Sequence, residues 1–171
     1  MLKKVYMTFF CIIIFSAIEV VYADPQPPTF EEKYAEGGYK SVEDAVKEFE
    51  NHFKCTVKLP TILPSISFTH KYGKFFEDKE YKMNDDLSIR FVNKDIKENL
   101  FKIDIRPPKN KLDFEGTKYT LQDGTKGIYF EHQIFNFFVF EKNNLQYILG
   151  IYKGVANKVP PEMLVKIANS I

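Results

Sequence analysis

The chain has no tryptophan, only three histidines and only two cysteines among its 171 residues. Cys11 lies in the apolar N-terminal segment, so a chain that loses this segment keeps Cys55 alone and can form no internal disulfide. The histidines are at least 18 positions apart, and no His-x-x-x-His or Glu-x-x-His pair occurs. The sequence therefore lacks the local signature of a zinc site, and we expect neither a metal nor a cofactor.

Motifs for catalysis are also lacking. There is no Gly-x-Ser-x-Gly sequence and no phosphate-binding glycine loop. The acidic residues at 77–78 and 84–86 lack the spacing and the glycine of a calcium loop. Cys55 is the best candidate nucleophile for an alternative function as a cell-wall hydrolase, but its place in an alternating apolar segment favours a small core residue. We expect no catalytic residues and no enzyme.

The sequence also has no excess of basic or acidic residues. Removal of residues 1–23 takes away Lys3, Lys4 and Glu19, which leaves 24 − 2 = 22 basic and 23 − 1 = 22 acidic residues. Binding to nucleic acid depends on neutralising phosphates, and binding to an anionic membrane surface depends on a basic patch. A neutral chain favours neither partner.

The N-terminus has the features of a secretory signal peptide. Lys3 and Lys4 precede a nearly uncharged apolar run over 5–21, and Val21 and Ala23 occupy the two positions that a signal peptidase reads. The alternative is a retained membrane anchor, but a run of about 17 residues is at the lower limit for spanning a bilayer. We expect cleavage near Ala23, a secreted or wall-associated protein, and no stable membrane span afterwards.

The rest of the chain divides into a leader and one domain. Residues 24–40 contain three prolines and the Gly37-Gly38 pair, which predicts a flexible leader without regular structure. A capped apolar stripe predicts a helix from Ser41 to about Phe53, and Pro161 begins a second helix near the C-terminus. Alternating segments predict strands at 55–59, 65–72 (ended by Gly73), 87–91, 101–105, 118–122, 126–132 and the two runs on either side of 141–144.

These elements predict an α+β fold over 41–171. The links between strands are short, and crossover helices are missing, so the sheet should be antiparallel. We therefore expect an antiparallel sheet of about seven strands, with an N-terminal and a C-terminal helix packed on it.

The most apolar stretch is 127–152, and both of its faces are apolar. Phe135, Phe137 and Val139 alternate with Phe138 and Phe140, whereas a strand with one wet face would alternate with polar residues. We expect this stretch to form the centre of the sheet, so something must cover each of its faces. The candidate contacts to an apolar ligand or partner are Phe137, Phe138, Phe140, Tyr147 and Tyr152, and the alternative is that these side chains are simply core.

Four short motifs resemble a known family. They are Val57-Lys-Leu-Pro-Thr-Ile-Leu-Pro64, Gly127-Ile-Tyr129, Asn144-Leu-Gln-Tyr-Ile-Leu149 and Leu164-Val-Lys-Ile-Ala-Asn-Ser-Ile171. Together they resemble a domain of unknown function in Firmicutes envelope proteins, which occurs as stand-alone secreted or lipoprotein forms and as the extracytoplasmic end of anti-sigma factors. The resemblance covers 42–171 and implies an exported α+β domain without catalytic residues. Family members usually carry a tryptophan where this chain is phenylalanine-rich around 138–140.

The sequence thus favours an exported, non-enzymatic envelope domain of a Gram-positive bacterium, serving interaction or sensing, with an envelope protein or an apolar ligand as its partner. The alternative is a carrier that holds a lipid-like ligand against the aromatic hairpin.

Overall fold

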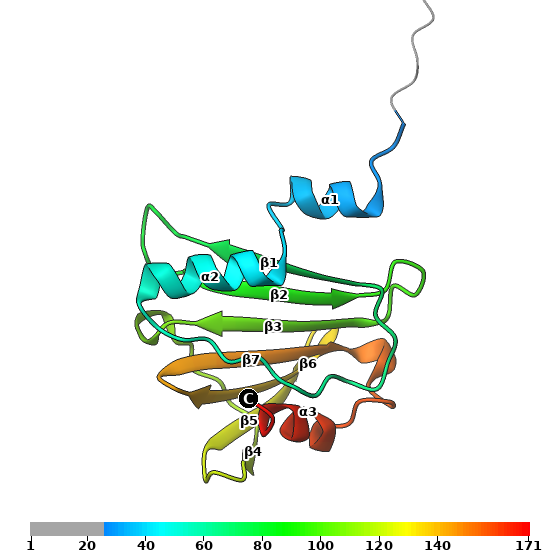
Figure 1. Cartoon of the computed structure of the whole chain (residues 1–171). Helices are drawn as coiled ribbons and strands as arrows, with labels where there is room; N and C mark the ends of the chain where they lie inside the picture. The colour runs from blue at the N-terminus through cyan, green and yellow to red at the C-terminus, as the bar shows by residue number, and fades with distance from the viewer. Residues whose placement is uncertain (1–25) are drawn as a thin grey trace, which may run out of the picture.

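The computed structural model describes residues 26–171, which form a seven-stranded antiparallel sheet with three helices (Figure 1). The predicted signal peptide, 1–23, lies outside the described residues. Across the sheet the strands follow the order β1-β2-β3-β7-β6-β5-β4. The strands are β1 (His70–Phe76), β2 (Asp86–Val92), β3 (Leu100–Arg106), β4 (Thr117–Thr120), β5 (Lys126–His132), β6 (Phe135–Lys142) and β7 (Leu145–Tyr152), and the helices are α1 (Phe30–Glu36), α2 (Val42–Phe53) and α3 (Pro161–Ala168).

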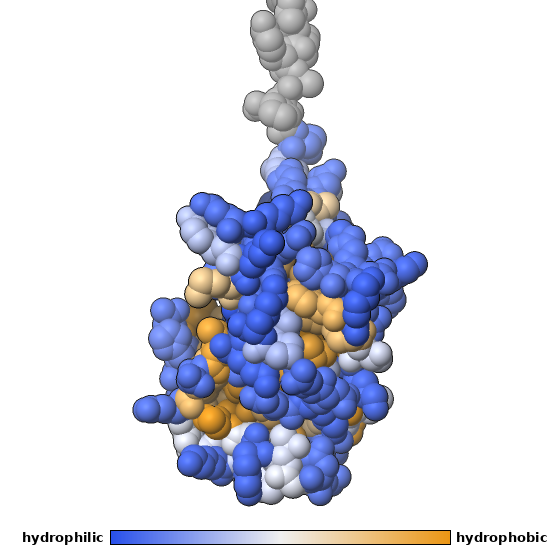
Figure 2. Space-filling model, turned by 90° about the vertical axis from the view of Figure 1, so that its left-hand side faces the viewer, coloured by the Kyte–Doolittle hydropathy of each residue, from blue (hydrophilic) through white to orange (hydrophobic). Residues whose placement is uncertain are grey.

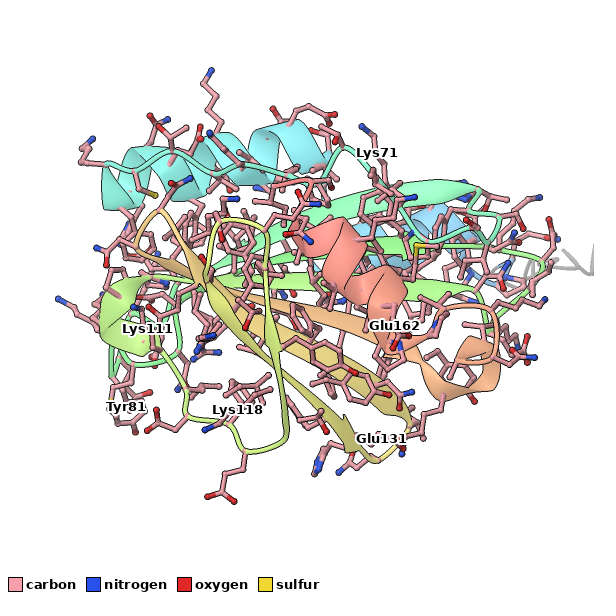
Figure 3. All side chains as sticks on the ribbon, turned by 90° about the horizontal axis from the view of Figure 1, so that it is seen from below. Lys71, Tyr81, Lys111, Lys118, Glu131 and Glu162 are labelled. Carbon is pink, nitrogen blue, oxygen red and sulfur yellow. The ribbon has the colours of Figure 1, made fainter. Side chains whose placement is uncertain are left out.

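Two of the helices cover one face of the sheet, which confirms the predicted α+β architecture. α2 packs on β1 and β2, α3 packs near β6, and both lie on the same side of the sheet (Figures 1 and 3). The buried core lies between these helices and the sheet. Its fully buried sheet residues include Leu87, Ile89, Phe101, Ile103, Ile105, Phe138, Tyr147, Leu149 and Ile151.

The close approach of α2 to the sheet depends on Gly73. The Ser41 hydroxyl accepts a hydrogen bond from the Asp44 N–H at 3.0 Å and caps the helix as predicted. Gly73, in the middle of β1, lies directly below, where an added Cβ would be 2.8 Å from the Cβ of Ala45. The prediction that Gly73 ends its strand was therefore wrong, because this glycine makes room for a helix.

The leader is more ordered than the sequence suggested. Residues 30–36 form α1, which begins with a capping box in which the Thr29 hydroxyl and the Glu32 carboxylate each accept a backbone N–H of the other residue. The Tyr34 ring stacks on Tyr72 of β1 with centroids 4.2 Å apart. Since Tyr72 and Gly73 point to opposite faces, α1 lies on the side of β1 away from α2.

The segment before β1 departs from the predicted strands. Residues 55–59 form no strand, because the backbone N–H groups of Val57 and Lys58 donate instead to the Glu50 carboxylate and to the Tyr147 hydroxyl. The strand expected over 65–72 begins only at His70, and the Ser67 carbonyl accepts the side-chain amides of Asn93 and Asn99. The alternating apolar residues here pack against the core without joining the sheet.

The apolar hairpin forms as predicted and lies at the centre of the sheet. β6 and β7 are joined through Asn143 and Asn144, whose φ angles of 50° and 63° suit a two-residue hairpin turn. Asp123-Gly124 joins β4 to β5, also as predicted, with Gly124 at φ 86°. β7 is the middle strand, so the prediction that this stretch forms the centre of the sheet is confirmed.

Candidate functional site

The sheet face opposite α2 and α3, called here the outer face, differs from the apolar core face. On β2 and β3 most of its side chains are polar or charged and alternate with core residues: Ser88, Arg90, Lys102, Asp104 and Arg106. On β6 and β7 it carries Phe135, Phe137, Val139 and Ile148. Lys118 of β4 lies on this side of the sheet (Figure 3). A charged strip and an apolar strip therefore meet in the middle of the outer face.

The charged strip is organised around Asp104. One of its carboxylate oxygens accepts hydrogen bonds from the Arg90 guanidinium at 2.6 Å and from the Ser88 hydroxyl at 2.8 Å. Its other oxygen lies 3.9 Å from the Nζ of Lys102. The side chains of Arg90 and Asp104 are only 18% and 17% exposed, so their pairing is screened less by water than that of a surface pair.

The apolar strip is a column of stacked rings. Phe130 lies between Phe114 and Phe137, with centroids 5.0 and 5.1 Å away and interplanar angles of 20° and 19°. The Nζ of Lys102 lies 4.7 Å from the ring centroid of Phe137 and 4.5 Å from that of Phe135. Stacking and cation–π contacts each contribute roughly 0.5–1.5 kcal/mol, so the column and the charged strip stabilise each other.

The loop formed by residues 111–116 covers one end of the outer face and holds Phe114 against the column of rings. The side-chain amide of Gln146 accepts the Leu112 N–H at 2.9 Å and donates to the Leu112 carbonyl at 2.8 Å. Lys111 also pairs with Glu141. The second face of the aromatic hairpin is therefore covered in part by the loop and in part by the charged strip.

Between the two strips lies a cavity of about 280 Å³. The charged strip forms one wall, and the aromatic column with the loop forms the other. The lining residues are Asp86, Arg90, Asp104, Arg106, Leu112, Phe114, Phe130, His132, Phe137 and Ile148. Such a site offers an apolar surface and fixed charges within one small volume, which is the usual composition of a small-molecule site.

Asp86 makes the charge of this cavity sensitive to pH. Burial raises the pKa of its carboxyl to about 6, and the negative charge of Asp104 adds to the effect. The positive charges of Arg106, Arg90 and Lys74 oppose the shift without cancelling it. Burial also lowers the pKa of Lys102. The cavity therefore loses a negative charge when the pH falls through about 6.

The candidate contact residues are divided between the two faces. Phe137 lines the cavity, and Tyr152 is half-buried on the outer face with its ring edge-on to Phe135. Phe138, Phe140 and Tyr147 are 0%, 2% and 0% exposed in the core beneath the helices. For these three the core alternative holds, because every second residue of a strand points to the other face.

The charged strip was missed by the search for motifs. Its signal was present as alternation, since the polar residues of 86–92 and 100–106 share one face once the two segments pair as strands. The alternation predicts the strands, but only the pairing of β2 with β3 brings their polar side chains into one strip.

The other residues considered for catalysis or metal binding do not come together in one site. Cys55 is half-buried, and burial raises the pKa of its thiol, which keeps it protonated. The Nε2 of His70 pairs with Glu31 of α1 at 2.8 Å. Within residues 26–171, no group of three or more His, Cys, Asp and Glu side chains could hold a metal ion.

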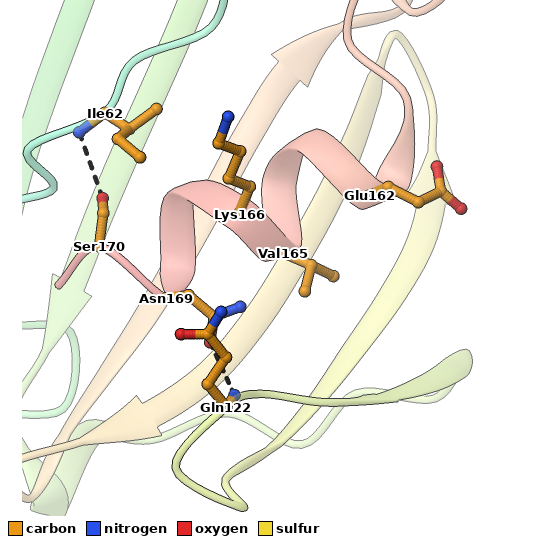
Figure 4. Close-up of a pocket in the computed structure, with 7 residues that line it drawn as sticks. All are labelled: Ile62, Gln122, Glu162, Val165, Lys166, Asn169 and Ser170. Atoms are coloured by element: carbon orange, nitrogen blue, oxygen red, sulfur yellow. Dashed lines mark hydrogen bonds between the residues drawn. The ribbon is translucent and has the colours of Figure 1, made fainter.

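A second, more open hollow of about 440 Å³ lies beside α3 (Figure 4). Two hydrogen bonds join residues that line it: the Ile62 N–H donates to the Ser170 hydroxyl at 3.2 Å, and the Gln122 N–H donates to the Asn169 side-chain oxygen at 2.8 Å. These bonds fix the C-terminal end of the chain to two loops. This hollow is also wider and more open than the outer-face cavity, which is therefore the better candidate.

The surface seen from one end of the strands is mainly hydrophilic, with hydrophobic residues visible between the hydrophilic ones (Figure 2). In the part of the chain that the structure describes, no helix combines the length and the apolar character needed to cross a bilayer. No protein-family model, curated protein or solved structure matches this chain. The resemblance to the Firmicutes envelope family therefore stays a prediction that rests on its four motifs.

Proposed function

We propose that this chain is an exported, non-enzymatic binding module of a bacterial envelope, serving interaction or sensing, and that its ligand or partner binds in the outer-face cavity. Phe137 is the observation that carries the proposal. Its neighbour Phe138 is fully buried in the core, whereas Phe137 lines a cavity opposite Arg90 and Arg106. An aromatic wall facing fixed charges suits recognition of a molecule that has both apolar and charged parts.

Export is supported by the sequence of 1–23 and by the resemblance to envelope proteins. The absence of enzymatic activity is supported by the protonated thiol of Cys55 and by the scarcity of motifs for catalysis. The cavity volume of about 280 Å³ falls just below the roughly 300–1,000 Å³ of typical small-molecule sites. This volume favours a small ligand, or one side chain of a partner, over the long acyl chain that a lipid carrier would hold.

Site-specific photocrosslinking tests the proposal in the cells that produce the protein. A photoreactive amino acid at Leu112, which is 45% exposed at the rim of the cavity, should form an adduct detectable by mass spectrometry. The same group at Met83, which is 68% exposed and outside the cavity lining, is the matched control. Phe137→Ala should abolish the adduct at 112. Equal adducts at both positions, or an adduct that survives Phe137→Ala, would contradict the proposal.

A further inference from the structure

The chemistry of the cavity walls narrows the class of ligand. Arg106 is anchored through its Nε, which donates to the Asn110 carbonyl at 2.6 Å. The two terminal amino groups of its guanidinium have no hydrogen-bond or ion-pair partner within residues 26–171. A guanidinium held in place with its paired donors free is suited to bidentate binding of a carboxylate.

The other arginine of the cavity is already occupied. The Nη1 of Arg90 donates both to Asp104 and to the Ile89 carbonyl, at 2.6 and 2.9 Å. Asp104 is in turn shared by Arg90, Ser88 and Lys102. Among the described residues, Arg106 is thus the cavity arginine without an ion pair, and Asp86 is the cavity carboxylate without one.

The aromatic wall presents ring edges. The two faces of Phe130 are covered by Phe114 and Phe137, and the two sides of Phe137 are covered by Phe130 and by the ammonium of Lys102. A phenyl ring is electropositive at its edge and electronegative on its face. The column therefore adds to the positive potential around Arg106 while still offering apolar contact.

The volume limits the size of the ligand. A cavity of about 150 Å³ in another protein holds a benzene molecule, so about 280 Å³ has room for one ring and a short acidic arm. A polycyclic or long-chain acid would extend beyond it.

We infer that the outer-face cavity binds a monocarboxylate that carries one flat apolar group, with Arg106 holding the carboxylate and Phe130 and Phe137 contacting the apolar group. The inference rests on the proposed function, because it names the ligand class for the same site. Two sources share this chemistry: a free aromatic acid and the C-terminal residue of a peptide that ends in phenylalanine.

Calorimetric titration of the exported chain tests the inference with defined probes. 3-Phenylpropionate should bind saturably, and its neutral amide and the corresponding amine should bind roughly ten- to hundredfold more weakly. Arg106→Gln should weaken binding of the carboxylate by a similar factor and leave binding of the amide unchanged. Arg106→Lys keeps the charge, so it should lose only part of the affinity. Lys118→Gln, which removes a positive charge from the same face outside the cavity lining, is the control and should change nothing.

The pH dependence gives a second readout. Between pH 7.5 and 5.5 the affinity for the carboxylate should rise, because Asp86 becomes neutral while a ligand with a pKa near 4.3 stays ionised. The other titratable or charged groups around Asp86 are Lys74, Arg90, Asp104, Arg106 and His132. Asp86→Asn should remove this rise, and a rise that persists in this variant would show that another group causes it.

Comparing the affinities for 3-phenylpropionate and acetyl-Gly-Gly-Phe distinguishes a free aromatic acid from the C-terminus of a peptide. A preference for either probe supports the inferred carboxylate site. Equal binding of amide and carboxylate, unchanged affinity in Arg106→Gln, or no saturable binding of any probe would overturn it. The proposed function would survive such a result if the crosslink at 112 still depended on Phe137. A crosslink that no longer depended on Phe137 would contradict both the proposed function and the inferred ligand class.

Discussion

Lys102 of β3 and Phe137 of β6 are in contact on the outer face because the residue between them is a glycine. This residue is Gly150 of β7, the strand that separates β3 from β6. Lys102 pairs with Gly150 across β3 and β7, and Phe137 pairs with it across β6 and β7. A Cβ at 150 would be 2.7 Å from the Cε of Lys102 and 3.1 Å from the Cε1 of Phe137. One missing side chain thus allows the charged strip and the aromatic column to make contact.

Gly150→Ala should separate these two side chains and destabilise the protein. We expect a loss of about 1–3 kcal/mol in the free energy of unfolding, the usual cost of inserting a methyl group into a packed site. Urea denaturation measures it. In a Lys102→Ala background the loss should shrink by at least about 0.5 kcal/mol, because the atom nearest to the new methyl group is gone. Full additivity of the two substitutions would contradict the contact.

Asp86→Asn should stabilise the protein at pH 7.5. The folded-state pKa of Asp86 is raised from 3.8 to about 6, so ionisation costs the folded state more than the unfolded state. The penalty is complete above about pH 6 and disappears as the pH falls toward 3.8. After discounting for solvent screening, we expect a gain of about 1–2 kcal/mol at pH 7.5.

Denaturation curves of wild type and Asp86→Asn from pH 4 to 8 measure this gain. The two curves should converge at the acidic end. Asp113→Asn, at an exposed position on the loop, is the control and should follow the wild type throughout. A stability difference that does not change with pH would show that Asp86 acts through packing and not through its charge.

Gly73→Ala should lift α2 from the sheet. The new Cβ would be 2.8 Å from the Ala45 Cβ and 2.9 Å from the Val42 Cα, and neither atom belongs to the flexible end of a side chain. We expect a loss of at least about 1–3 kcal/mol, measured by thermal or urea unfolding. Gly37→Ala, with its nearest contact at 3.3 Å and a φ of −70°, should change stability by no more than about 1 kcal/mol.

The sequence of the N-terminal segment predicts that a signal peptidase cleaves the chain after Ala23. Exported protein should begin at Asp24, and intact mass spectrometry of the secreted and wall fractions measures this directly. Ala23→Glu places a charge where the peptidase requires a small residue, so the longer chain should accumulate with the membrane. Ala35→Glu, in α1, should be cleaved normally. An uncleaved wild-type chain would favour the retained anchor instead.

Much of the fold followed from periodicity and turn chemistry. The stripe after Ser41, Pro161 and the Asp123-Gly124 turn each correspond to an element that is present. Two of the failures share one physical cause. Residues 55–59 alternate like a strand, but two of their N–H groups donate to side chains of α2 and β7. Gly73 was predicted to end its strand, but it lies within β1 and leaves room for Ala45 of α2. In each case a distant partner decided the local structure.

The sequence by itself determined that the 127–152 stretch would be the centre of an antiparallel sheet with both of its faces covered, since no other stretch is so apolar. Only the tertiary structure decided what covers each face. Phe138 entered the helix-covered core and Phe137 did not, because the helices pack on one side and the strand period is two. The pairing of β3 with β7 then placed Lys102 beside Phe137, which is more than thirty residues away in the chain, and Arg106 in the lining of the same cavity.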